Sequence, residues 1–312
     1  MLTVADLISR YIDEMNGTNG QPGVKTLGST HLYALRAMAR RPIGQLAAAT
    51  LNKHDIIEYA KERRKTVAPS TVLQDMAYLA GPLKYAPAVW EDCEAFSGAA
   101  PIAIAKPMLV KYGLIAKGQP RRRIPTDEEI GLLVAHFASK KWTGRSDIPM
   151  ADILLFALCS TRRRGEICRM LWSDIDWDRK DKEGNPTPMY MVRDIKHPLY
   201  TKGNHKWFPL FPELAEIINR QPRTAERVFP YRGQTVGHAY IRAKAKLGIT
   251  GLRFHDSRRH AITHWLALLK SPHQVKLISG HATTLILERV YDVSDPAKLH
   301  AAVESATQAQ QH

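Results

Sequence analysis

Two arginine motifs in the second half of the chain have the side chains needed to bind and cleave a phosphodiester. Arg163 stands three residues before Glu166, and His255 stands three residues before Arg258. Each guanidinium offers a planar fork of donors that matches phosphate oxygens, so two arginines could neutralise the charge that builds up during cleavage. Residues three apart share a helix face, which would let Glu166 orient Arg163 and let His255 and Arg258 face one phosphate.

A nucleophile is also available near the C-terminus. His281 follows a glycine, and Tyr291 comes ten residues later with no other tyrosine after it. A phenol with a pKa of about 10 is a weak nucleophile at neutral pH, so surrounding cations and a histidine base would have to help remove its proton. Tyr240 precedes the His255 motif and is a poor substitute.

Other common catalytic motifs are absent from the sequence. It has no GxxxxGK[ST] phosphate loop, no GxGxxG motif after a strand and no GxSxG elbow. It has no paired CxxC motifs, and His260 and His264 lack the glutamate of an HExxH zinc site. We therefore expect no metal and no cofactor.

Composition and charge indicate a globular protein that binds a polyanion. Of 312 residues 44% are hydrophobic, and the net charge is +15. Residues 1–116 carry 13 basic and 10 acidic side chains (net +3), whereas residues 117–312 carry 32 and 20 (net +12). Such an excess attracts nucleic acid. The three cysteines and the lack of a signal or membrane segment favour the cytoplasm.

The first part of the chain predicts a small helical bundle. Apolar residues at positions 4, 7, 8, 11 and 12 share one helical face, and the pattern repeats at 72, 76, 79 and 83. The basic segment AKGQPRRRIP then suits a linker, which divides the chain into a domain at 1–115, a linker at 116–124 and a domain at 125–312. Thr126 and Glu129 fit a capping box that starts the second domain.

The second domain mixes helices with a β-hairpin. A continuous apolar helix is expected over 152–160, strands over 189–195 and 206–211, weaker helices over 213–220 and 234–247, and a strong helix after residue 254. The predicted fold class is mainly α with a small antiparallel β-sheet (α+β).

In their order, these motifs resemble the tyrosine recombinase (phage integrase) family. The segments that carry the resemblance are STRRRGEIC at 160–168, RDIKHPLYTKGNHKWFPL at 193–210, LRFHDSRRH at 252–260 and ISGHATTLILERVYDVS at 278–294. The resemblance covers the whole second domain, and the helical first part looks like the family's core-binding domain, which clamps DNA.

The resemblance implies a site-specific recombinase, with a mobile-element integrase as the leading interpretation. It would cut double-stranded DNA through a 3′-phosphotyrosyl intermediate and use Arg163, His255, Arg258, His281 and Tyr291. It would act as a homo-tetramer on DNA, with the C-terminal tail docking on a neighbouring protomer and with accessory directionality proteins as possible partners.

In this family a hairpin lysine protonates the leaving 5′-oxygen. Lys196 ends the first predicted strand and is favoured over Lys202 in the loop, since a strand end fixes a side chain better; Lys206 is a distant third. Further basic residues are candidates for DNA contact. They are Arg121, Arg122, Arg123, Arg162, Arg164, Lys202 and Arg259.

Two other functions fit parts of the pattern. A type IB topoisomerase-like nicking-closing enzyme would use similar chemistry without site choice or strand exchange. A DNA-binding protein without catalysis would be expected to have lost the nucleophile or an arginine, and here every candidate position is filled.

Overall fold

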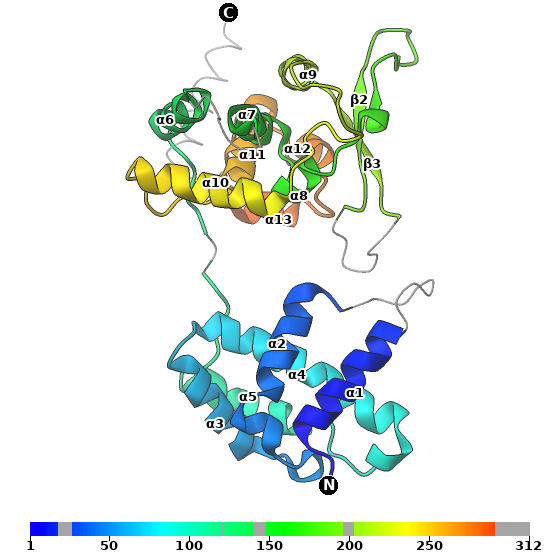
Figure 1. The fold of residues 1–312 in the computed structure, drawn as a ribbon, viewed down its shortest axis with the longest axis vertical. Coiled ribbons are helices and arrows are strands. Elements are labelled where there is room, and N and C mark those ends of the chain that lie inside the picture. Colours follow the sequence, from blue (N-terminus) through cyan, green and yellow to red (C-terminus); the bar gives the residue numbers. More distant parts are fainter. Residues whose placement is uncertain (18–26, 120, 140–147, 196–202, 291–312) are drawn as a thin grey trace, which may run out of the picture. The chain divides into compact units, whose positions relative to one another are not determined.

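A computed structural model describes residues 1–17, 27–119, 121–139, 148–195 and 203–290. The chain divides into two compact units, Met1–Pro120 and Arg121–His312 (Figure 1). No described helix is both long and apolar enough to span a bilayer.

The described elements of the first unit are helices that bury their apolar stripes against each other. The predicted stripe of the first helix is buried at all five positions, and so is the stripe over 72–83. The first helix packs on the second and fourth, and the third packs on the fifth. These helices are α1 (Val4–Gly17), α2 (Ser29–Ala39), α3 (Lys53–Arg64), α4 (Pro69–Val89) and α5 (Ala100–Lys111).

The second unit is a helical assembly with one small sheet, so the predicted fold class is confirmed (Figure 1). Its helices are α6 (Asp127–Ala138), α7 (Met150–Ser160), α8 (Arg164–Ile167), α9 (Pro212–Asn219), α10 (Gly233–Lys246), α11 (Asp256–Leu269), α12 (Pro272–Ser279) and α13 (Leu285–Val290). Its strands are β1 (Ile175–Asp176), β2 (Met189–Val192) and β3 (Lys206–Pro209).

Helix α7 is the centre of the second unit. It packs against α6, α9 and α11, and most of its side chains are buried, including Ile153, Phe156 and Ala157. This is why its sequence is a continuous apolar run and not an amphipathic stripe. A helix held on several sides gives the residues at its C-terminal end a fixed position.

The sheet has the order β1-β2-β3 and is antiparallel throughout. The register pairs Tyr190 with Phe208, which are both buried with ring centroids 5.9 Å apart. The two predicted strands therefore pair as a hairpin, while the two-residue β1 was not predicted. The hairpin brings Phe208 into the core beside the end of α7.

The division between the units falls inside the predicted linker. Residues 121–124 belong to the second unit, because Arg121 pairs with Asp256 and Arg123 pairs with Glu129. The predicted capping box is confirmed, since Thr126 Oγ1 accepts from the Glu129 amide (3.2 Å) and Glu129 accepts from the Thr126 amide (2.9 Å).

Candidate active site

The turn after α7 carries the first arginine of the site. Thr161 ends the helix in a left-handed conformation (φ 59°), and Arg163 is the N-cap of the short helix α8. Glu166, with its side chain 4% exposed, accepts from the Arg163 amide (2.9 Å) and from Arg163 Nη1 (2.7 Å). Burial opposes ionisation of Glu166, but the charges of Arg162 and Arg163 still hold its pKa below the ordinary value. Glu166 thus fixes both the backbone and the side chain of Arg163.

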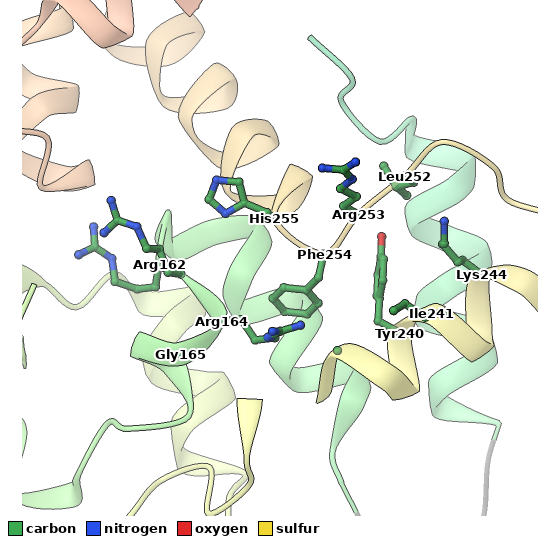
Figure 2. Close-up of a pocket in the computed structure, with 12 residues that line it drawn as sticks. Arg162, Arg164, Gly165, Tyr240, Ile241, Lys244, Leu252, Arg253, Phe254 and His255 are labelled. Carbon is green, nitrogen blue, oxygen red and sulfur yellow. The ribbon is translucent and has the colours of Figure 1, made fainter. Parts of the chain in front are cut away.

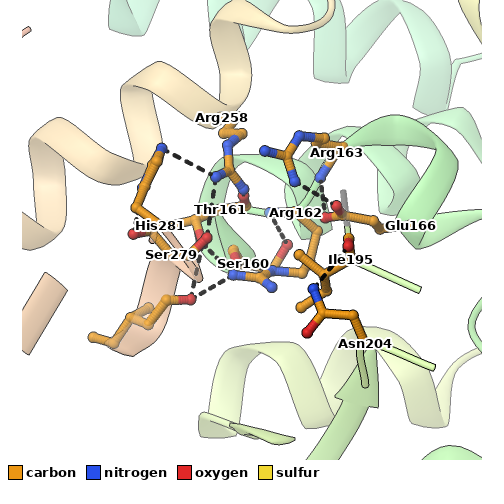
Figure 3. Close-up of polar contacts among 11 residues, drawn as sticks. Ser160, Thr161, Arg162, Arg163, Glu166, Ile195, Asn204, Arg258, Ser279 and His281 are labelled. Atoms are coloured by element: carbon orange, nitrogen blue, oxygen red, sulfur yellow. Dashed lines mark hydrogen bonds and ion pairs between the residues drawn. The ribbon is translucent and has the colours of Figure 1, made fainter. Parts of the chain in front are cut away.

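Arg258, the second arginine, projects from the first turn of α11 into the same region (Figure 3). It is buried, and it donates to the Thr161 carbonyl and, over 3.0 Å, to the Ser279 carbonyl. Its guanidinium is therefore held between the end of α7 and the end of α12. Arg163 and Arg258, which are 95 residues apart in the sequence, lie together in this cluster.

His281 follows α12 directly after Gly280, which ends the helix with a φ of +70°. Its Nε2 lies 3.4 Å from Arg258 Nη2, and its Nδ1 lies 2.7 Å from Ser279 Oγ. Since a guanidinium only donates, this contact requires an unprotonated Nε2. Burial and the charges of Arg258, Arg163 and Arg162 lower the pKa of His281 to about 4, so the imidazole is neutral at physiological pH.

His255 lines a pocket of about 650 Å³ next to the arginine turn (Figure 2). Partial burial and the charges of Arg258 and Arg163 lower the pKa of His255, so its ring is neutral and can accept a proton near pH 7. The pocket wall also carries the cations Arg164, Lys244 and Arg253, and none of the described residues that line it is acidic. The pocket therefore suits an anion.

Arg164 packs against α10 over two glycines, of which Gly237 is the one that leaves it room. A Cβ on Gly237 would lie 1.9 Å from Arg164 Nη1, and one on Gly233 would lie 3.6 Å from Arg164 Nε. Gly237 thus has to lack a side chain for Arg164 to lie there. Arg164 is half-buried at the pocket wall and remains a candidate for DNA contact.

Arg162 was predicted to contact DNA at the surface, and that prediction is wrong. The residue is 2% exposed, and its guanidinium donates to the Ser160 carbonyl (3.0 Å) and the Thr161 hydroxyl (2.8 Å). The physical reason is its place in the chain. It follows the buried end of α7, and the left-handed Thr161 turns it inward while Arg163 faces outward with 35% of its side chain exposed.

The linker arginines also have partners within the second unit. Arg121 Nη2 lies 2.7 Å from the Asp256 carboxylate, whose side chain is 3% exposed, and Arg123 pairs with Glu129. Arg121 and Arg123 were predicted to contact DNA; both guanidiniums are engaged in these ion pairs and remain partly exposed, so the DNA contact stays a prediction. The remaining candidates from these segments are Arg122, which is exposed, and Arg259, which is half-buried.

The hairpin loop with the candidate lysines is held at both described ends. Ile195 and Asn204 exchange hydrogen bonds of 2.9 Å, and the Gly203 amide donates to Asp194 Oδ1 over 2.8 Å. Lys196 and Lys202 themselves lie outside the described residues. Lys196 directly follows the fixed residue Ile195, and Lys202 directly precedes the fixed residue Gly203. A more rigid attachment was the reason for favouring Lys196, and it therefore no longer distinguishes the two lysines.

The predicted nucleophile, Tyr291, also lies outside the described residues. Helix α13 ends at the residue before it and packs on α12, with Leu287 buried against Ile262 and Val275. The alternative, Tyr240, is 2% exposed, and burial raises the pKa of its phenol, which makes it a poor nucleophile. In the described part of the chain, no three His, Cys, Asp or Glu residues gather as metal ligands would.

Sequence patterns missed three residues that support the site. Thr161 and Ser279 supply the carbonyls that hold Arg258, and Asp256 anchors the start of α11. Asp256 could have been found from the sequence, because it is a single acidic residue between His255 and Arg258 in an otherwise basic segment. A backbone carbonyl leaves no signal in the residue type, so the roles of Thr161 and Ser279 required the structure.

Comparison with known proteins yields relatives by sequence and by fold. No family model matches. A Haemophilus influenzae protein named as an integrase/recombinase is 23% identical over 299 residues, which cover 95% of this chain and 88% of that protein. The Tn1549 transposon integrase in complex with a circular intermediate DNA superimposes with a TM-score of 0.68 at 14% identity, covering 98% of this chain and all of that one. A lambda integrase dimer bound to a core site gives 0.58 at 15% identity, covering 94% and 78%.

The chain thus has the fold of the Tn1549 and lambda integrases, which were solved in complex with DNA. Along nearly its whole length the chain is also similar in sequence to a protein named as an integrase/recombinase, which agrees with the resemblance of its motifs to the tyrosine recombinase family.

The Arg121–Asp256 pair predicts a specific loss of stability. Arg121→Met leaves the buried Asp256 carboxylate without its cation and should lower the free energy of unfolding by about 1–3 kcal/mol, less than for a fully buried pair because Arg121 is partly solvated. Urea unfolding measures this. The exposed neighbour provides the control, since Arg122→Met should change stability by less than about 0.5 kcal/mol. Equal effects of the two variants would contradict the assignment.

The lowered pKa of His281 predicts a pH dependence of stability. The unfolded chain binds a proton at His281 below about pH 6.5, whereas the folded protein binds it only near pH 4. The free energy of unfolding should therefore fall as the pH drops from 6.5 towards 4. His281→Asn should flatten this slope, while His238→Asn at an exposed site should keep it. An unchanged slope in His281→Asn would show that the ring is not held neutral.

Proposed function

We propose that this protein is a site-specific DNA recombinase of a mobile element, which cuts and rejoins double-stranded DNA through a 3′-phosphotyrosyl bond. The observation that carries the proposal is the cluster of Arg163, Arg258 and His281, which come from three segments and leave a surplus of positive charge beside a pocket lined by further cations. The negative charge of a scissile phosphate would offset the positive charge of the arginines that Glu166 leaves unbalanced.

The two arginines would hold the non-bridging oxygens of the phosphate. Arg163 is presented towards solvent by Glu166, and Arg258 Nη2 faces His281 at the long distance of 3.4 Å, which a phosphate oxygen could replace. Both guanidiniums would bind the phosphorane more tightly than the ground state, since the phosphorane carries more negative charge. With phosphate bound, neutral His281 would take the tautomer that carries its proton on Nε2, with Nδ1 accepting from the Ser279 hydroxyl, and would donate a hydrogen bond to the same phosphate.

Tyr291 is proposed as the nucleophile. Its support is that α13, which ends one residue earlier, packs on the helices that carry Arg258 and lead to His281. The phenolic oxygen would form the bond to phosphorus and pass its proton to the neutral His255, while the bond to the 5′-oxygen breaks. Attack by a 5′-hydroxyl of a second duplex would reverse these steps and release Tyr291, so the energy of the phosphodiester is conserved.

A lysine of the hairpin loop would protonate the leaving 5′-oxygen. We keep Lys196, which ends the predicted strand, as the proposed acid and Lys202 as the alternative. Each lysine is next to a residue fixed by hydrogen bonds, Ile195 or Gly203, so the choice between them is left to experiment. The two strands that flank the loop, β2 and β3, are paired, and β3 carries Phe208, whose ring lies against Arg162 of the arginine turn.

The assembly is proposed from a related protein. Lambda integrase has been solved as a tetramer bound to a Holliday junction, with a TM-score of 0.56 to this chain. We infer a homo-tetramer on DNA in the cytoplasm, with the segment after Tyr291 docking on a neighbouring protomer and with accessory directionality proteins as further partners. The units at 1–115 and 125–312 would both bind the duplex, joined by the 116–124 linker.

A suicide substrate tests the chemistry. Duplex DNA from the element's end, nicked close to the scissile phosphate, loses the short 5′-hydroxyl fragment after cleavage and traps the covalent complex. The wild-type protein should form an adduct that survives denaturing electrophoresis. Tyr291→Phe should bind the DNA with unchanged affinity and form none, because only the hydroxyl is removed.

The controls separate the other two functions. Tyr240→Phe should retain the adduct. Binding without an adduct in the wild-type protein would favour the non-catalytic interpretation. Relaxation of any supercoiled plasmid without exchanged strands would favour the topoisomerase-like one.

A substrate with a 5′-bridging sulfur distinguishes the lysines. A thiolate leaves without a proton. The sulfur substrate therefore restores cleavage by an enzyme that lacks the general acid, but it does not correct any other defect. Lys196→Ala should cleave the ordinary substrate about 100-fold more slowly and recover with the sulfur substrate. Rescue of Lys202→Ala alone would transfer the role to Lys202.

A further inference from the structure

Arg162 is a fully buried arginine at the centre of the proposed site. Its Nε donates to the Ser160 carbonyl over 3.0 Å, and its Nη2 donates to the Thr161 hydroxyl over 2.8 Å and to the Ile278 carbonyl. Its guanidinium carbon lies 3.7 Å from the centroid of the Phe208 ring. Burying a charge is costly unless contacts of this kind compensate it, so a role beyond filling space is expected.

These contacts connect three separate segments. Ser160 and Thr161 end α7, Phe208 lies on β3 of the lysine hairpin, and Ile278 lies in the last turn of α12. The packing is tight, since a Cβ on Gly280 would lie 3.0 Å from Phe208 Cζ and 3.8 Å from Arg162 Nη1. Gly280 immediately precedes His281, so this contact reaches a proposed phosphate ligand.

The peptides that Arg162 contacts are the ones that hold Arg258. Arg162 binds the Thr161 hydroxyl, and Arg258 binds the Thr161 carbonyl. Arg162 binds the Ile278 carbonyl, and Arg258 binds the next one, that of Ser279. Arg163 follows Arg162 directly. A shift of Arg162 would therefore move the supports of both arginines (Figure 3).

The contacts suit a guanidinium in particular. A flat fork can stack on Phe208 with one face while its edges donate to acceptors on two segments, and its charge is offset by the Glu166 carboxylate, whose pKa it lowers. A lysine could keep the charge and one hydrogen bond, but it could neither stack in this way nor bridge both segments.

We propose that Arg162 is a positioning residue, whose buried guanidinium joins the arginine turn, the lysine hairpin and the end of α12 and so sets the spacing of Arg163, Arg258 and His281 around the phosphate. This inference rests on the proposed function. It assigns Arg162 no contact with DNA.

Substitutions of Arg162 should slow cleavage without weakening DNA binding. Arg162→Met keeps the bulk but loses the fork, and it should slow single-turnover adduct formation about 100-fold, because small displacements of catalytic groups cost that much. Arg162→Lys should form the adduct about tenfold faster than Arg162→Met. The dissociation constant for DNA should stay at the wild-type value. Arg169→Met, which removes an exposed arginine three residues beyond Glu166, should leave both quantities unchanged.

A double-mutant cycle tests whether Arg162 acts through Arg258. In an Arg258→Lys background, Arg162→Met should cost much less than in the wild type, since the group that it positions is already lost. Fully additive losses, or DNA binding weakened as much as cleavage, would reduce Arg162 to a general stabiliser and overturn the proposal. A wild-type rate in Arg162→Met would do the same.

A measurement without chemistry separates this inference from the proposed function. The ring ¹⁵N resonances of His281 report its contacts with Ser279 and Arg258. They should shift in the charge-conserving Arg162→Lys variant and stay in place in Arg169→Lys. Identical His281 resonances in Arg162→Lys and wild type would overturn the inference even if cleavage is observed. If the wild type forms no adduct, the proposed function fails, and the resonances alone decide the role of Arg162.

Discussion

The repulsion between the guanidiniums of Arg162, Arg163 and Arg258 is the constraint that the rest of the second unit must satisfy. Among the described residues, Glu166 is the carboxylate paired within this group, so the charge is only partly offset. The remainder is stabilised by main-chain dipoles at the ends of α7 and α12, where carbonyl groups accept the arginine donors. These carbonyls belong to Ser160, Thr161, Ile278 and Ser279.

This arrangement explains several features that would otherwise look unrelated. The left-handed Thr161 turns one arginine inward and leaves the next facing solvent. Burial and the same positive charges lower the pKa of both histidines near the cluster, which favours their neutral forms at pH 7. An excess of positive charge that is costly in the free protein would become favourable if the cluster binds a phosphate, as we propose.

The sequence predicted the elements and the cluster well where residue type carries the signal. The α7 run, the paired strands at 189 and 206 and the Thr126 capping box follow from hydrophobic pattern and capping chemistry. The convergence of Arg163 and Arg258 followed from family resemblance. Which arginine of the run at 162–164 is buried depends on one backbone angle at Thr161, which no local pattern reveals. Likewise, charge alone could not tell the paired Arg121 from its exposed neighbour Arg122.

The central claim is that a phenolic oxygen of this chain becomes covalently joined to DNA beside the arginine cluster. Its most direct test is mass spectrometry of the trapped adduct after digestion with protease and nuclease. The account predicts a nucleotide remnant, linked through a 3′-phosphate, on the peptide that contains Tyr291. A remnant on a peptide that contains another residue, such as Tyr240, or DNA that is bound but never covalently attached, would contradict it.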